Sequence, residues 1–103
     1  MNALIRSRKK QIEAFCKEWN IRELQVFGSV TTNNFGPQSD IDIVVDFPKG
    51  SRHTLIQLAR MEEDLERIFG RRVDLLTRQA VEQSRNYIRK KSILASLEKV
   101  YGA

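Results

Sequence analysis

The segment from Asp40 to Phe47 constrains the fold most strongly, because polar and apolar residues alternate along most of its length. Successive side chains of a strand point to opposite faces of the sheet. One face of this strand then carries only isoleucine, valine and phenylalanine, and the other carries the carboxylates of Asp40, Asp42 and Asp46. Such an acidic face makes a poor core. The segment therefore predicts a sheet with one face buried under helices and an open cleft on the other.

Hydrophobic periodicity predicts helices and short strands around this central strand. Apolar residues at three-and-four spacing indicate helices, and short alternating runs bounded by turn residues indicate strands. The predicted helices span residues 4–19 and 54–69, with a last helical stripe at 93–101, and the other predicted strands span residues 23–27 and 72–76. The order of these elements predicts an α+β (mixed α/β) fold, in which a small β-sheet is covered mainly on one face by helices.

Length and composition favour a single globular domain over residues 1–103. Of the residues, 41% are hydrophobic and 30% are charged, which suffices for a modest core. A single cysteine and a single histidine exclude an internal disulfide and a Cys/His metal site. No apolar run approaches the roughly 18 residues of a membrane span, so we expect a cytoplasmic protein that contacts no membrane. The net charge of +5 admits nucleic acid, a nucleotide or an acidic protein as partner without choosing among them.

Several reactive or charged side chains outside the central strand have simple structural interpretations. Cys16 lies in the apolar stripe of the first predicted helix and is expected to be a small buried hydrophobe. His53 has no acid or serine partner nearby and is expected at the surface or at a helix start. A basic run near the C-terminus has the composition to bind RNA or phosphate, but such a run is more often a solvated helix face or a face for an acidic partner. This run comprises Arg85, Arg89, Lys90 and Lys91.

The motif with the clearest chemistry joins the pair Gly28-Ser29, at the end of a predicted strand, to Asp40-Ile41-Asp42 on the central strand. Glycine lets the backbone approach a ligand closely, and the Ser29 hydroxyl together with free N–H groups can hold a phosphate. Asp40 and Asp42 project side by side, with about 7 Å between their Cα atoms from the strand rise. Two such carboxylates can share Mg²⁺ ions, and Asp74 on the next strand is the candidate third ligand. These parts suit phosphoryl or nucleotidyl transfer.

With this motif the chain resembles the nucleotidyltransferase superfamily typified by DNA polymerase β. The resemblance is to its smallest branch, the minimal nucleotidyltransferases (MNT), many of which look like antitoxins paired with HEPN-domain toxins. Gly28-Ser29 and Asp40-Ile41-Asp42 match the family pattern residue for residue, and the third acidic position falls on Asp74. The resemblance covers nearly the whole chain in element order. It implies the nucleotidyltransferase fold, with a small mixed sheet.

The resemblance also implies a reaction and a partner. It implies an enzyme that uses ATP and two Mg²⁺ ions to transfer AMP to a hydroxyl, here that of a tyrosine on a HEPN ribonuclease toxin. The protein would then act as the antitoxin of a type VII-like toxin–antitoxin pair, in a hetero-oligomer with its toxin. By the same resemblance Asp40, Asp42 and Asp74 bind the metal ions, and Asp74 helps to deprotonate the attacking hydroxyl. Gly28 and Ser29 hold the donor phosphates.

One departure from the family pattern leaves alternatives open. Relatives commonly carry arginine shortly after the Gly-Ser pair, whereas this chain has Val30-Thr31-Thr32-Asn33-Asn34. The basic residues considered as substitutes are Arg71, Arg72, Lys49 and Arg52. A catalytically weak or inactive protein of the same fold would neutralise its partner by binding alone. A subunit of a small-molecule nucleotidyltransferase, acting for example on an aminoglycoside, is the other alternative, but a chain this short has little room for a dedicated acceptor pocket.

Overall fold

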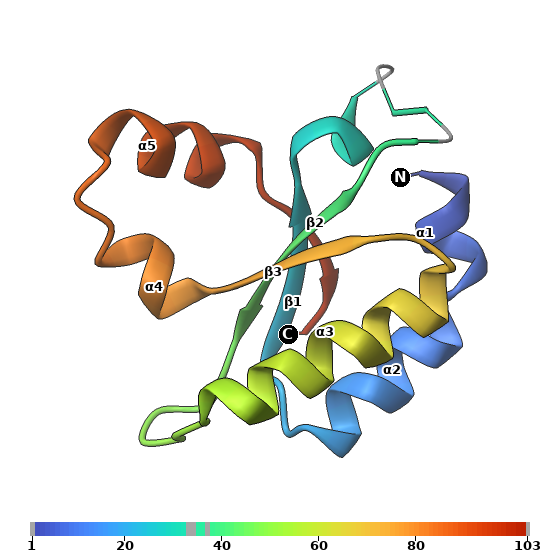
Figure 1. Ribbon diagram of the computed structural model, residues 1–103, viewed down its shortest axis with the longest axis horizontal. Coiled ribbons are helices and arrows are strands. Elements are labelled where there is room, and N and C mark those ends of the chain that lie inside the picture. Colours follow the sequence, from blue (N-terminus) through green and yellow to red (C-terminus); the bar gives the residue numbers. More distant parts are fainter. Residues whose placement is uncertain (1, 33–34, 37, 103) are drawn as a thin grey trace.

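The described strands form one mixed sheet in the order β3-β2-β1-β4 (Figure 1). The structure is a computed structural model that describes residues 2–32, 35–36 and 38–102. Strand β1 runs antiparallel to both of its neighbours, and β2 runs parallel to β3. The strands are β1 (Glu23–Phe27), β2 (Ile41–Asp46), β3 (Val73–Thr77) and β4 (Glu98–Tyr101). The mixed sheet that the family resemblance implied is therefore confirmed.

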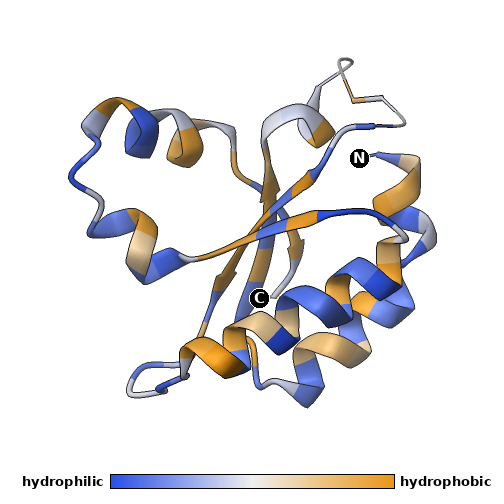
Figure 2. Cartoon of the chain, in the orientation of Figure 1, coloured by the Kyte–Doolittle hydropathy of each residue, from blue (hydrophilic) through white to orange (hydrophobic). Residues whose placement is uncertain are grey.

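Helices α2 and α3 cover one face of the sheet, and α4 and α5 lie on the other side (Figure 1). The helices are α1 (Ala3–Ser7), α2 (Lys9–Glu18), α3 (Leu55–Phe69), α4 (Arg78–Glu82) and α5 (Tyr87–Ser96), with a 3₁₀ turn η1 (Gly28–Thr31). Figure 2 shows hydrophilic and hydrophobic residues interleaved along α3, as expected for a helix with one buried side. In the described ranges, no helix combines the length and the apolarity needed to cross a membrane.

The main core lies between α2, α3 and the apolar face of the sheet. Its strand residues are those that the alternation predicts, since Ile41, Ile43 and Val45 of β2 are fully buried against this layer. The helices contribute buried residues at the predicted helical spacing, namely Ile12, Phe15 and Cys16 from α2 and Met61, Leu65 and Phe69 from α3. Burial of this apolar surface is the largest favourable contribution to folding.

Helix α3 begins and ends where the sequence predicts. The Thr54 hydroxyl accepts a hydrogen bond from the Gln57 amide at 3.1 Å, and the Gln57 side chain accepts one from the Thr54 amide at 2.9 Å. This reciprocal pair satisfies two amides at the helix start. At the other end, Gly70 has a φ of 65° and its amide donates to the Glu66 carbonyl at 2.8 Å. Glycine ends the helix here because a residue with a Cβ atom is strained at this φ.

The second face of the sheet is partly covered, although the sequence predicts an open cleft along it. Phe27, Val44, Val81 and Ile93 form a second buried cluster beneath α4 and α5. Val44 lies on the same face of β2 as the aspartates, and it has no exposed surface. Asp42, at the start of β2, is only half-buried. Near the motif, the accessible part of this face is therefore confined to the start of β2.

The first predicted helix is interrupted, which corrects the expectation of one helix over residues 4–19. The break lies at Arg8, whose backbone leaves helical geometry with φ −107° and ψ 13°. The Arg8 Nε donates to the carbonyl of Ile68 in α3 at 2.9 Å. This contact gives an orphan carbonyl near the end of α3 a partner.

The last predicted helical stripe is wrong beyond Ser96. Residues 98–101 form β4, which pairs antiparallel with β1 and buries Val100 in the main core. The strand gives hydrogen-bond partners to an edge of β1 that would otherwise have none. Its four residues are too few to show the alternation that would distinguish a strand from the end of a helix.

Replacing Gly70 with alanine tests the helix stop. An added Cβ meets no atom within 4 Å, so the cost comes from backbone strain at φ 65° alone. We expect Gly70→Ala to lower the free energy of unfolding by about 1 kcal/mol, measured by urea denaturation. Gly36→Ala is the matched control, because Gly36 does not have a positive φ and is not expected to lose stability. Equal losses in both variants would contradict this role of Gly70.

Candidate active site

The two halves of the Gly-Ser and Asp-x-Asp motif touch at Gly28. Strand β1 ends at Phe27, and Gly28 opens η1 with a φ of 74°. A Cβ atom at this position would collide with Oδ2 of Asp42. Only a residue without a side chain lets the carboxylate come this close to the backbone. Ser29 follows in the same turn and is half-buried.

The parallel pairing of β2 with β3 places Asp42 directly opposite Asp74. Facing residues on adjacent strands lie about 4.8 Å apart and point their side chains to the same face. Asp74 is exposed, and so is Asp40, which lies just before the first residue of β2. The structure therefore brings Asp42 and Asp74 together beside Gly28, with Asp40 at the start of the same strand.

Three neighbouring charges act on the Asp42 carboxyl. Partial burial raises the pKa of Asp42, and the negative charges of Asp74 and Asp40 raise it further. The guanidinium of Arg89, on α5, acts in the opposite direction and lowers the pKa of Asp42. The start of β2 is thus a site of mutual repulsion between carboxylates, with one cation nearby.

The donor chemistry of this site fits a divalent cation such as Mg²⁺. Mg²⁺ binds carboxylate oxygens, and a cation between Asp42 and Asp74 would remove the repulsion that raises the pKa of Asp42. A Cβ atom at Gly28 would collide with the Asp42 carboxylate, so the glycine is what keeps the position of this carboxylate open. Within the described ranges, no three His, Cys, Asp or Glu side chains already lie as ligands around one point. The carboxylates of Asp40, Asp42 and Asp74 provide oxygen ligands, but they do not surround a common metal-binding point.

Threonine hydroxyls stabilise the turn that follows Gly28. The Thr31 hydroxyl donates to the Gly28 carbonyl at 2.7 Å, and the Thr32 hydroxyl donates to the Ser29 carbonyl at 2.9 Å. These bonds fix the backbone of η1 at the site. Asn33 and Asn34, the last two residues of the segment that lacks the usual arginine, lie outside the described residues.

Three of the four basic candidates for the role of the missing arginine, Arg71, Lys49 and Arg52, are engaged or placed elsewhere. The Arg71 guanidinium donates to the carbonyls of Gly36 and Ser39 at 2.7 and 3.2 Å and lies 4.4 Å above the Phe35 ring, so it supports the loop before Asp40. Lys49 and Arg52 line a cavity of about 700 Å³ at the other end of β2. Arg72 is exposed, and its carbonyl accepts from the Ile41 amide at 3.0 Å.

Arg89 is the basic residue that sequence reasoning did not connect with the site. The sequence indicates it only as part of a basic run, with the composition to bind RNA or phosphate but more often found on a solvated helix face or facing an acidic partner. No spacing rule links Arg89 to the motif, because only the tertiary structure packs α5 beside η1. Arg89 and Gly28 line the same groove, which places the guanidinium beside the site, and its charge lowers the pKa of Asp42.

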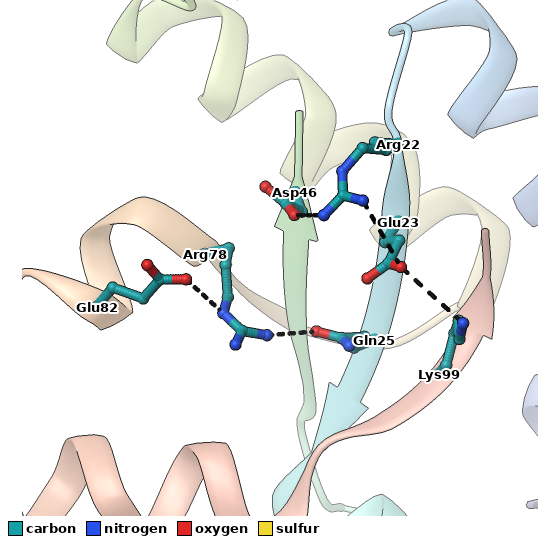
Figure 3. Close-up of polar contacts among 7 residues, drawn as sticks. All are labelled: Arg22, Glu23, Gln25, Asp46, Arg78, Glu82 and Lys99. Atoms are coloured by element: carbon teal, nitrogen blue, oxygen red, sulfur yellow. Dashed lines mark hydrogen bonds and ion pairs between the residues drawn. The ribbon is translucent and has the colours of Figure 1, made fainter. Parts of the chain in front are cut away.

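Asp46 is kept apart from the site. It lies at the far end of β2 and pairs with the guanidinium of Arg22 (Figure 3). Glu23 lies 4.0 Å from Arg22 and 3.9 Å from Lys99 in the same group of charges. The acidic residues at this end of the sheet have cationic partners, in contrast to Asp42 and its neighbours.

Cys16 and His53 take the structural roles expected of them. Cys16 has no exposed surface, and burial raises the pKa of its thiol to about 12, with a smaller contribution from Glu13. A thiol of this kind is a poor nucleophile. The His53 ring is stacked on Phe47 with 3.9 Å between ring centroids, next to the start of α3.

Comparison with known proteins decides the family. The family model described as "Nucleotidyltransferase domain" matches residues 8–97, which is most of the chain. The chain belongs to the nucleotidyltransferase family. This nucleotidyltransferase is 31% identical over 81 residues to the protein adenylyltransferase MntA of Thermococcus cleftensis, a match covering 79% of this chain and 77% of that relative.

Solved structures of related proteins share the fold of this nucleotidyltransferase. A structure described as a "putative minimal nucleotidyltransferase" matches with a TM-score of 0.69 at 27% identity, covering 95% of this chain and 95% of that chain. A toxin–antitoxin crystal structure with AMP-PNP matches with a TM-score of 0.72 at 16% identity, covering 92% of this chain and 73% of that chain. A tri-AMPylated Shewanella oneidensis HEPN toxin in complex with its MNT antitoxin gives a match with a TM-score of 0.67 at 16% identity, covering 96% of this chain and 73% of that chain. At 16% identity the likeness is one of fold.

Asp42→Asn tests the electrostatic account of the nucleotidyltransferase site. Because the folded state raises the pKa of Asp42, folding favours the protonated acid, and the contribution of this carboxyl to the stability of the wild type falls as the pH rises above about 3.8. We expect Asp42→Asn to remove this loss and to raise the melting temperature at pH 7 in EDTA, where each 1 kcal/mol corresponds to roughly 4–8 °C.

Asp46→Asn is the matched control for that measurement. It makes the same chemical change on the same face of β2 but removes the partner of Arg22, so we expect its melting temperature to be equal to or below that of the wild type. A melting temperature of Asp42→Asn no higher than that of the control would contradict the account.

Proposed function

We propose that the protein is a protein adenylyltransferase that transfers AMP from ATP to a tyrosine hydroxyl of a HEPN-domain toxin and so acts as its antitoxin. The observation that carries the proposal is the contact of Gly28 with Asp42 and the pairing of Asp42 with Asp74. The 31% identity to an MntA protein adenylyltransferase supports this reaction. The fold of the MNT antitoxin bound to a tri-AMPylated HEPN toxin supports the class of partner.

Each motif residue has a distinct part in this reaction. Because Gly28 has no side chain, the backbone beside the Asp42 carboxylate stays accessible to a ligand. The Ser29 hydroxyl and the amides of η1 contact the donor phosphates. Asp40, Asp42 and Asp74 would hold two Mg²⁺ ions, which supply positive charge to the triphosphate and to the attacking oxygen when they are bound. Asp74 is exposed beside Asp42, where an incoming hydroxyl can reach it.

The chemical step exchanges one phosphorus–oxygen bond for another. The tyrosine oxygen forms a bond to the α-phosphorus of ATP, while the bond from that phosphorus to the oxygen bridging to the β-phosphate breaks. Pyrophosphate leaves with the bonding electron pair. The hydroxyl proton passes to the carboxylate of Asp74, which is exposed directly beside Asp42.

The position of the site favours a macromolecular acceptor. Asp40 and Asp74 are exposed, so the described residues leave the acceptor side of the site open. A small molecule would need a pocket of several hundred Å³ on that side to hold it in line. A tyrosine on the surface of another protein brings its own positioning surface with it.

A labelling experiment with the HEPN protein that co-purifies with this chain tests the proposal. With Mg²⁺ and ATP labelled on the α-phosphate, the wild type should label the partner, whereas ATP labelled on the γ-phosphate should not. Asp42→Asn should reduce labelling by a factor on the order of 100 or more. Asp46→Asn, whose carboxylate pairs with Arg22, should label as the wild type does.

Two outcomes would contradict the proposed reaction, and one would favour an alternative. Absence of label from the wild type, or undiminished labelling by Asp42→Asn, contradicts AMP transfer by this site. The segment after Ser29 without arginine is the observation that favours a protein that acts by binding alone. That alternative predicts that an Asp40→Asn, Asp42→Asn double variant still neutralises the toxin in cells, whereas AMP transfer predicts loss of protection.

A further inference from the structure

A groove runs between the start of η1 and α5, directly beside the acidic site. It has a volume of about 570 Å³, and its lining includes Phe27, Gly28, Ile88, Arg89 and Ile93. Small-molecule sites in proteins occupy about 300–1,000 Å³. The groove adjoins the candidate active site, because Gly28 in its lining lies against the Asp42 carboxylate and Phe27 pairs with Asp42 on the adjacent strand.

The walls of this groove combine an apolar surface with one cation. Phe27 and Ile93 are buried at its base, whereas Ile88 is 81% exposed at its edge. An isoleucine this exposed gains little from the folded chain itself, and it has apolar surface to bury against a ligand.

Arg89 is available for a ligand in the groove. Among the described residues its side chain makes no ion pair and no hydrogen bond. The neighbouring cations differ, since Arg78 pairs with Glu82 and Lys90 donates to the Glu82 carbonyl at 2.6 Å. Arg89 lines the groove together with Gly28, whose backbone lies against the Asp42 carboxylate.

We propose that this groove binds the donor nucleoside triphosphate, with Arg89 on its phosphates and Ile88 against its nucleoside. The inference rests on the proposed function, because it assigns the donor site of that reaction. Arg89 then supplies from α5 the cation that the segment after Ser29 lacks. The planar guanidinium suits this task, because it can donate two parallel hydrogen bonds to phosphate oxygens.

The arrangement also accounts for the charge balance of the site. The carboxylates of Asp40, Asp42 and Asp74 repel a triphosphate, and Mg²⁺ alone would have to reverse the sign of the field there. The Arg89 guanidinium at the groove edge reduces the electrostatic repulsion between these carboxylates and the phosphates that enter on this side. The base of the nucleotide lies further along the groove, against apolar side chains that contact any of the common bases.

Titration calorimetry on the full chain tests the proposal with two probes. One is an ATP analogue with a methylene group between the α- and β-phosphates, which cannot be transferred, and the other is inorganic tripolyphosphate, each with Mg²⁺. We expect Arg89→Ala to weaken binding of both probes on the order of tenfold or more, and Arg89→Lys to give an intermediate loss. Ile88→Ala should weaken binding of the analogue and leave binding of tripolyphosphate unchanged.

Lys91→Ala is the matched control, because it removes one positive charge from the exposed side of the same helix. We expect it to change either Kd less than about twofold, as a surface charge screened by solvent should. Binding of the analogue by Arg89→Ala as tightly as by the control, or no binding by the wild type, would overturn the inference.

Failure of this inference and failure of the proposed function are distinguishable. If the wild type labels its partner from ATP while Arg89→Ala binds the analogue normally, the groove is not the donor site and the proposed function stands. If Arg89→Ala loses nucleotide affinity while the wild type labels no partner, the donor site is supported and the proposed acceptor is wrong.

Discussion

The site depends on the parallel pairing of β2 with β3, which sets the carboxylates of Asp42 and Asp74 on facing positions of adjacent strands. Antiparallel pairing of β1 with β2 brings Phe27 opposite Asp42 from the other side, so that Gly28 follows immediately at the end of the sheet. This register is maintained by burial of the opposite face, because a slip of one residue would turn Ile41 and Ile43 out of the core. The hydrophobic core therefore fixes the position of the acids, although none of the acids belongs to it.

Charge is distributed unevenly along the face that carries the acids. At the far end of β2, Asp46 is paired with Arg22, and Glu23 lies close to both Arg22 and Lys99 (Figure 3). At the start of β2, Asp42 meets two other carboxylates, and Arg89 is the cation that acts on it. Like charges held together without a full set of partners destabilise the folded chain. Such an arrangement is typical of functional sites, where a bound cation or ligand supplies the missing charge.

The sequence predicts most of the helices and strands that form the core and the motif acids Asp40 and Asp42, because those features follow from local periodicity and from spacing within one motif. Residues 54–69 have caps at both ends and a clear helical stripe, and the helix is found there. Strand β4 and the break at Arg8 could not be predicted, because each depends on a partner distant in sequence, namely β1 and the Ile68 carbonyl. Arg89 was missed for the same reason, since only the tertiary fold brings α5 to the start of β2.

The central claim is that a divalent cation and its nucleotide bind at the start of β2, beside Gly28, and not in the cavity near Lys49 and Arg52. Paramagnetic broadening of backbone amide signals by Mn²⁺, in the presence of the methylene ATP analogue, tests this most directly. The account predicts that broadening centres on Gly28, Asp42 and Asp74 and that it is absent in Asp42→Asn. Broadening centred on residues 45–53, or equal broadening in the variant, would contradict it.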